Sequence, residues 1–360
     1  MRKRGDYVLA KTITESFREA QARLVVQTAD LPLGTLADMV DNGGIDLAPG
    51  FQRRERWNNE KQSALIESFL LNVPVPPIYL AEEEDGTYSA IDGKQRLRAI
   101  ADFMKDRLVL RKLERLVEAE GLRFQDMPTD ITNALKLRPF LRVVTLLKQT
   151  DSELKYEVFL RLNRGGESLN PQEIRNVAFR GPMNDTIYEL AKLSFLKQQL
   201  KIENDKSGAY RDMQDAEYVL RFLTLNKSVE DFSGSLYHEM DSFMRLNQNP
   251  GNQKLDALRQ SFICSLERCE TIWGDKAFKR PDGDSWRDQT LAGMYDAQML
   301  AVASLTDVAF KKAEAKKEEV ARRTRCLFTD DEFEKSVRSG TNTPARIKYR
   351  VRKMKEALEF

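Results

Sequence analysis

Residues 87–104 read TYSAIDGKQRLRAIADFM, and this stretch is the clearest local signature in the chain. Alternating residues over Thr87–Ile91 predict a strand, and Asp92-Gly93 predicts a tight turn after it. A helix is expected over Gln95–Met104 because apolar residues recur there at helical spacing. Its buried face would consist of Leu97, Ile100, Ala101 and Met104. The stretch therefore predicts a strand–turn–helix unit.

The turn of this unit suits a phosphate group. A glycine between a strand and a helix lets a ligand approach the backbone, and a helix start offers unpaired N–H groups and a positive dipole end. Lys94 and Arg96 add positive charge, and arginine binds phosphate oxygens in bidentate fashion. Asp92 fits if it caps the helix, holds an arginine or binds a divalent metal carried by a nucleotide. A tight turn with solvated charges and a capping Asp fits the same residues, so both interpretations stay open.

Two other segments carry candidate ligand-binding residues. Residues 51–57, FQRRERW, place three arginines beside two aromatic rings, a composition that suits stacking on a nucleotide or nucleic acid. A surface loop anchored by Trp57 fits them equally well. Residues 159–170 predict a helix that ends at Gly165-Gly166 and is followed at once by a capped helix, which makes a fixed loop that presents Asn163 and Arg164. The alternative for this segment is a helix–turn–helix corner without a ligand.

The remaining pattern predicts two domains: an α/β domain over residues 1–180, and an all-helical domain over 181–360. Residues 73–81, VPVPPIYLA, contain three prolines and predict an extended, edge-like path. Asn170-Pro171-Gln172-Glu173 predicts a helix start with a capping box. The other expected helices of the first domain are Leu33–Met39, Asn59–Leu71 and Asp151–Leu162, and its other expected strands are Ile45–Leu47 and Phe140–Leu147. The expected helices of the second domain are Met183–Leu200, Met213–Leu225, Leu236–Leu246, Lys254–Trp273 and Leu291–Glu319.

Composition excludes several classes of protein. The 58 Lys and Arg residues nearly balance 56 Asp and Glu residues, so the chain is not a globally polycationic DNA-coating protein. His238 is the single histidine, whereas HNH nucleases, HD phosphohydrolases and HExxH proteases each need at least two. Three cysteines without a CxxC pair argue against a disulfide framework or zinc knuckle. With no apolar run of about 20 residues and no signal peptide, we expect a cytoplasmic protein.

One nuclease pattern survives these exclusions. The chain has no Walker loop and no GxSxG motif. Asp92-Gly93-Lys94 fits the Asp/Glu-x-Lys half of a metal-dependent nuclease site, with Glu82–Asp85 as possible partner acids. The alternative function is therefore a stand-alone metal-dependent DNA nickase or endonuclease with Asp92 in its metal site.

The motifs also occur together and in order: FQRRERW, a helix, VPVPPIYL, IDGKQRLRAI, then FLRLNRGGESLNPQEIRN. This series, over about Leu31–Arg180, resembles the GmrSD restriction-endonuclease N-terminal domain family, which has a ParB/sulfiredoxin-like fold. The family usually shows Asp-Gly-Gln-Gln-Arg, and Lys94 stands at the third position here. Residues 215–223 and the closing helix around Arg346 also resemble the helical half of such proteins.

The resemblance implies a nucleotide-binding and NTP-hydrolysing module used in bacterial defence against phage or modified DNA. Asp92, Gln95 and Arg96 would then be catalytic. The implied nucleotide site adds Gln52, Arg53, Gly93, Lys94, Asn163, Gly165 and Gly166. The implied cofactor is an NTP with Mg²⁺. Turnover should be slow, because no Walker lysine or paired general base is recognisable.

Many family members carry a C-terminal HNH nuclease domain, for which this chain lacks the histidines. We therefore expect a separate nuclease or ATPase effector protein as partner. DNA is the other expected partner. Residues 311–325 hold seven basic and three acidic residues, and the final sixteen hold six and two, a local net of +4 in each case. A phosphate-tracking stripe that includes Arg350 and Lys353 would explain this bias, and a solvated helix face is the alternative.

Overall fold

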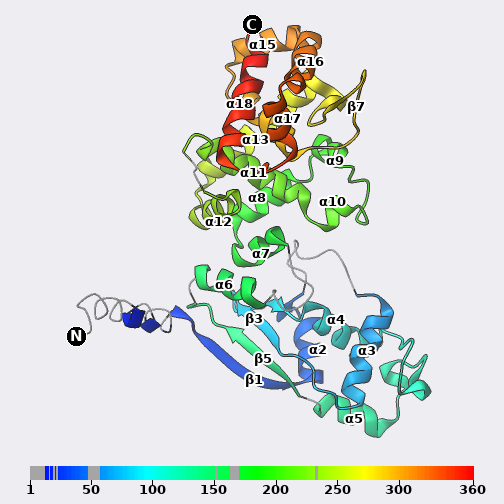
Figure 1. Cartoon of the computed structure of the whole chain (residues 1–360). Helices are drawn as coiled ribbons and strands as arrows, with labels where there is room; N and C mark the ends of the chain where they lie inside the picture. The colour runs from blue at the N-terminus through cyan, green and yellow to red at the C-terminus, as the bar shows by residue number, and fades with distance from the viewer. Residues whose placement is uncertain are drawn as a thin grey trace, which may run out of the picture. The chain divides into compact units, whose positions relative to one another are not determined.

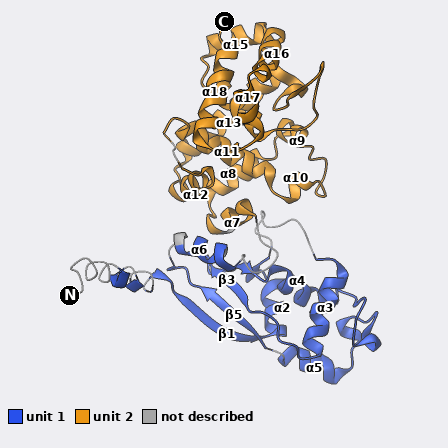
Figure 2. Ribbon diagram, in the orientation of Figure 1, with its two compact units in different colours: residues 1–169 blue, residues 170–360 orange. Residues whose placement is uncertain are grey.

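The structure is a computed structural model of the 360-residue chain (Figure 1). It describes residues 13–15, 17–18, 21, 23–47, 57–138, 140–150, 152–162, 170–231 and 234–360. The chain divides into two compact units, residues 1–169 and 170–360 (Figure 2). The division between the units lies N-terminal to the domain boundary expected at residue 180. A mixed sheet with helices followed by a helical unit confirms the predicted fold class.

Unit 1 is built on a five-stranded sheet with the order β1-β5-β3-β4-β2. The strands are β1 (Val26–Pro32), β2 (Ile45–Asp46), β3 (Ile78–Glu82), β4 (Tyr88–Asp92) and β5 (Phe140–Leu146). β3 pairs antiparallel with β4 and parallel with β5, so it is a central strand. The expected edge-like path over residues 73–81 is therefore wrong. Its three prolines all precede β3, and the strand keeps every amide that the two ladders need.

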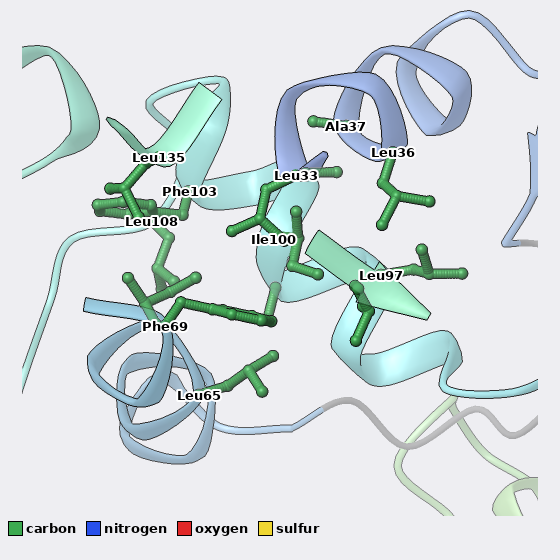
Figure 3. Close-up of a cluster of buried hydrophobic side chains, with 14 of the residues drawn as sticks. Leu33, Leu36, Ala37, Leu65, Phe69, Leu97, Ile100, Phe103, Leu108 and Leu135 are labelled. Carbon is green, nitrogen blue, oxygen red and sulfur yellow. The ribbon is translucent and has the colours of Figure 1, made fainter. Parts of the chain in front are cut away.

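Among the described residues that follow β1, the α-helices of unit 1 are α2 (Leu33–Asp41), α3 (Asn59–Leu70), α4 (Lys94–Met104), α5 (Thr129–Leu137) and α6 (Ser152–Leu162). Two short 3-10 turns, η1 (Val117–Ala119) and η2 (Phe124–Asp126), lie between α4 and α5. The core joins Leu33 and Leu36 of α2, Phe69 of α3, and Leu97 and Ile100 of α4 (Figure 3). The predicted strand–turn–helix unit is thus confirmed. Its helix buries Leu97, Ile100 and Ala101 as expected, whereas Met104 is only half-buried and Phe103 is buried.

A loop between α4 and η1 is held by side chains rather than by regular secondary structure. The amide of residue 111 donates to Ser63 Oγ at 2.9 Å. The amides of residues 112 and 113 donate to the Glu120 carboxylate at 2.9 and 3.0 Å. Those of residues 114, 115 and 116 donate to the Glu67 carboxylate at 3.2, 2.7 and 2.9 Å. Six consecutive amides therefore have side-chain acceptors, and we call residues 111–116 the braced loop.

The bracing by Glu67 should depend on pH. Burial raises the pKa of the Glu67 carboxyl, but hydrogen bonds from the amides of residues 116, 115 and 114 outweigh burial and hold the pKa below its ordinary value of 4.5. The stabilisation is complete above the pKa of the unfolded chain and is lost as the pH falls through the lower pKa of the folded protein. Hydrogen-exchange protection of amides 114–116 should therefore decline below about pH 4.5.

The Glu67→Gln variant should lose part of this protection at neutral pH, because its NH2 group cannot accept a hydrogen bond, and should be destabilised by about 1–3 kcal/mol. Glu118→Gln, which changes an exposed carboxylate nearby, is the matched control. Equal protection in both variants would show that Glu67 does not brace the loop.

In its described residues, 170–231 and 234–360, the regular structure of unit 2 is helical apart from a two-stranded hairpin, β6 (Pro281–Asp282) and β7 (Ser285–Trp286). Its helices are α7 (Pro171–Ala178), α8 (Pro182–Leu190), α9 (Ser194–Gln199), α10 (Gly208–Arg211), α11 (Gln214–Ser228), α12 (Leu236–Leu246), α13 (Asn252–Trp273), α14 (Ala292–Ala303), α15 (Asp307–Ala315), α16 (Lys317–Cys326), α17 (Asp331–Arg338) and α18 (Pro344–Leu358). Two predicted helices, over residues 183–200 and 291–319, are interrupted. Thr306 explains one break, because its hydroxyl accepts from the Ala309 amide and so caps a new helix. None of the helices in the described ranges is long and apolar enough to cross a bilayer.

The centre of unit 2 contains a carboxylate between two arginines. Asp296 of α14 accepts two hydrogen bonds of 2.6 Å from Arg221 of α11 and another from Arg350 of α18. Arg350 also donates to the carbonyl oxygens of Ser336 and Thr341 at 2.6 and 2.7 Å. Burial lowers the pKa of Arg350 to about 10, although Asp296 opposes this shift. The network joins four helices, α11, α14, α17 and α18, and the turn before α18.

The predicted DNA contact by Arg350 is therefore wrong, since its side chain is 0% exposed. Ile347, Val351 and Met354 are buried on the same helix. Arg350 follows Ile347 by three residues and precedes Met354 by four, so it lies on the buried face of α18. The count of basic residues in α18 therefore wrongly predicted that Arg350 is exposed.

Asp296→Asn should destabilise unit 2 by about 3–5 kcal/mol, because it leaves two buried guanidinium groups without a countercharge. Asp256→Asn is the matched control, since Asp256 pairs with Arg259 at the surface and its side chain is 72% exposed. Denaturant unfolding followed by circular dichroism measures both. Equal midpoints for the two variants would contradict a structural role for the network.

Candidate functional site

The candidate site is the corner between β4 and α4. Asp92 ends β4, Gly93 is the N-cap residue with φ of +92°, and α4 begins at Lys94. A Cβ atom on Gly93 would lie 2.2 Å from Cδ1 of Ile78 on β3. Both the left-handed backbone and this close approach require glycine. The predicted tight turn is thus confirmed, with a physical reason for its glycine.

Arg96 holds the corner to the chain segment that leads into β3. Its Nη2 donates to Asp92 Oδ2 at 2.6 Å, and its Nη1 donates to the carbonyl oxygen of Pro77 at 3.0 Å and to that of Pro76. The Arg96 side chain is 11% exposed, whereas that of Asp92 is 41% exposed. Arg96 therefore already binds protein groups, while Asp92 keeps a solvent-facing surface.

Gln95 holds the corner to the start of α3. Its Oε1 accepts from the Trp57 amide at 3.2 Å, and Gln62 Nε2 donates to the Trp57 carbonyl oxygen at 2.9 Å. Asn58 caps α3 by accepting from the Lys61 amide at 2.9 Å. The last residue of the FQRRERW segment is thus bonded directly to the corner, although 38 residues separate Trp57 from Gln95.

Five predicted nucleotide-binding residues lie outside the described residues: Gln52, Arg53, Asn163, Gly165 and Gly166. Their neighbours in the sequence are described. Trp57 follows residues 51–56 and is bonded to Gln95, and α6, which precedes residues 163–169, contacts β4.

The corner has groups that suit a phosphate with a divalent cation. The first-turn amides of α4 face its N-terminus, where the helix dipole is positive and Gly93 has no side chain to cap them. Lys94 begins this turn and is half-buried. Asp92 offers a partly exposed carboxylate, the donor type that Mg²⁺ prefers. Asp92 is thus the residue of this corner that could hold a divalent cation, and Lys94 and the helix start are the groups that could hold a phosphate.

The hypothesis that Glu82–Asp85 complete a metal site with Asp92 is wrong. In the β3–β4 hairpin, Asp92 pairs with Tyr79 and Glu82 pairs with Tyr88, so the acids lie at opposite ends. Among the described residues, no group of three or more His, Cys, Asp and Glu side chains could hold a metal ion.

The predicted capping box at the start of α7 is confirmed. Asn170 Oδ1 accepts from the Glu173 amide at 2.9 Å, and Glu173 Oε2 accepts from the Asn170 amide at 2.7 Å. The helix that follows this capping box buries a charged residue, which the sequence analysis did not predict. Arg175 of α7 is 0% exposed and donates to Asp241 of α12 at 2.6 Å. Arg175 therefore serves the interior of unit 2.

The basic stripe predicted in the C-terminal half is partly neutralised. Arg322 and Arg323 both bind Glu319, at 2.6 and 3.1 Å. Lys353 lies 3.6 Å from Glu356 and its side chain is 29% exposed, so its DNA contact stays a prediction.

A mixed sheet with a glycine corner at a helix start defines unit 1 as an α/β domain with a candidate phosphate site. Residues 34–180 match the family described as GmrSD restriction endonuclease, N-terminal domain. The match confirms the resemblance inferred from the motifs, covers less than half of the chain, and connects the protein with restriction-type systems. No curated protein and no solved structure matches the chain.

The Gly93→Ala substitution should destabilise the protein about 1–3 kcal/mol more than Gly86→Ala. Both glycines have positive φ, +92° and +81°, so both alanines are strained. Only at Gly93 would the new Cβ also meet a core side chain, because nothing lies within 4 Å of the equivalent position at Gly86. Urea unfolding of the two variants measures the difference, and equal stability would contradict the close approach.

Proposed function

We propose that this protein is a nucleotide-binding and slowly NTP-hydrolysing, DNA-sensing component of a restriction-type defence system, and that it acts with a separate effector. The observation that carries the proposal is the β4–α4 corner, where Gly93 brings the start of α4, Lys94 and the Asp92 carboxylate together. The corner lies within the residues that match the restriction-endonuclease family.

The residues of the corner divide into two proposed roles. Gly93, Lys94 and the first turn of α4 bind phosphate oxygens, and Asp92 binds the Mg²⁺ that accompanies them. Gln95 and Arg96 position these groups, because Gln95 bonds the Trp57 amide and Arg96 bonds Asp92 and two carbonyl oxygens. The bound Mg²⁺ would neutralise charge that develops on the phosphates.

The proposal includes a separate effector because the sequence has too few histidines for an HNH nuclease site. These 360 residues contain a single histidine, His238, whereas an HNH site needs at least two, so these residues do not form an HNH site by themselves. In this proposal, NTP hydrolysis at the corner signals to a partner nuclease or ATPase that this protein has bound DNA. The protein itself does not cut DNA.

Lys94→Ala should weaken NTP binding about tenfold or more, because a charge-assisted hydrogen bond contributes about 1.5–3 kcal/mol. The matched control is Lys105→Ala, which removes a lysine at the other end of α4, where Lys105 pairs with Asp38 at 2.9 Å. Titration calorimetry with each Mg²⁺-NTP measures the affinities. Equal affinity of Lys94→Ala and wild type would refute the phosphate site.

Purified protein incubated with supercoiled plasmid, Mg²⁺ or Mn²⁺ and each NTP should release phosphate slowly and leave the plasmid intact. Asp92→Asn should abolish the phosphate release, because it removes the metal-binding charge. Nicking that co-purifies with the wild-type protein and disappears in Asp92→Asn would establish the nickase instead.

A further inference from the structure

The braced loop, residues 111–116, presents cations on a rigid support. Its sequence RKLERL holds three basic residues and one acidic residue. Arg111, Lys112 and Arg115 are exposed, whereas Leu113 is 8% exposed and packs into the core of unit 1. The loop therefore turns its charged side chains to solvent while an apolar residue anchors it.

The backbone of the loop is ordered before any partner binds. All six amides donate to side-chain acceptors on Ser63, Glu67 or Glu120, at 2.7 to 3.2 Å. Ordering a backbone costs free energy, and a loop that is already ordered does not incur this cost when it binds.

Among the described residues, no carboxylate forms an ion pair with Arg111 or Arg115. Glu67 and Glu120 direct their oxygens to the loop amides, although Glu67 also attracts Arg115 and Glu120 attracts Arg111. Lys112 lies 2.5 Å from Glu60, but the two side chains are 72% and 47% exposed. Such an exposed pair is weak, so a phosphate can replace Glu60.

We propose that the braced loop binds the sugar–phosphate backbone of duplex DNA through Arg111, Lys112 and Arg115. The inference rests on the proposed DNA-sensing function and adds the surface that would contact DNA. Regularly repeated phosphates suit three cations on one short rigid loop, whereas a protein partner would also need apolar contact area. Phosphate contacts of this kind set affinity and register without reading base sequence.

The triple variant Arg111→Gln, Lys112→Gln, Arg115→Gln tests the proposal in the full chain. The logarithm of the DNA association constant should fall less steeply with the logarithm of salt concentration. The slope should decrease by about 0.9 for each lost phosphate contact, or about 2.7 for three. Fluorescence anisotropy with a labelled 20-base-pair duplex measures it, and circular dichroism confirms that the variant is folded. The substitutions leave the six amide hydrogen bonds in place.

The matched control neutralises three exposed lysines of unit 2, Lys311→Gln, Lys312→Gln and Lys317→Gln. A flattened slope in the loop variant supports the proposal, whether or not the control also changes. An unchanged slope in the loop variant overturns it, and a flattened slope in the control alone moves the DNA contact to residues 311–325. If the wild-type protein binds no duplex at 50 mM salt, the DNA-sensing function fails together with this inference.

Two single variants separate charge from order. Glu114→Gln removes the one acidic side chain of the loop and should raise DNA affinity at low salt. Glu67→Gln keeps all three cations but replaces one of the two acceptor oxygens with an NH2 group that cannot accept, so loop amides lose a hydrogen bond. Because it also removes a negative charge beside Arg115, which by itself would raise affinity, a lower affinity in this variant reports the lost order of the loop. Affinities equal to wild type in both variants would contradict a DNA contact at this loop.

Discussion

Arg96 forms the interaction on which the candidate site depends. One guanidinium bonds the Asp92 carboxylate at the end of β4 and the carbonyl oxygens of Pro76 and Pro77 before β3. Since β3 is the central strand, this contact sets the central strand and the start of α4 relative to each other. Gly93 makes the arrangement possible, because a larger residue would collide with Ile78. Arg96, Asp92 and Gly93 thus stabilise the fold of unit 1 and also form the candidate site.

Buried arginines have the corresponding role in unit 2. Asp296 lies between Arg221 and Arg350, and Arg175 bonds Asp241. Breaking such a pair leaves an unpaired buried charge, which costs more free energy than the intact pair contributes. These arginines therefore restrict which helices can neighbour one another. They also show why a high count of basic residues in this chain does not translate directly into a binding surface.

The division between positioning and contacting residues shapes the proposed function. Gln95 and Arg96 belong to the most recognisable motif of the chain, yet both side chains bond protein backbone. Asp92, with its partly exposed carboxylate, and Lys94, at the start of α4, are the residues proposed to contact the ligand. The position at which this chain differs from the usual motif of the family, Lys94, is thus a residue expected to touch the nucleotide.

The sequence alone determined the local elements of this protein. Apolar spacing and turn residues predicted β4, α4 and the α7 capping box, because these depend on contacts a few residues apart. The central place of β3, the strand β1 and the burial of Arg350 came only from the tertiary structure. β1 carries little apolar alternation and is specified by its pairing with β5, more than 100 residues away in the chain. Likewise, the hydrogen bond between Trp57 and Gln95 and the bracing of residues 111–116 by Glu67 each join segments that are far apart in the sequence. No local pattern predicts these contacts, because every residue except proline has the same backbone N–H group.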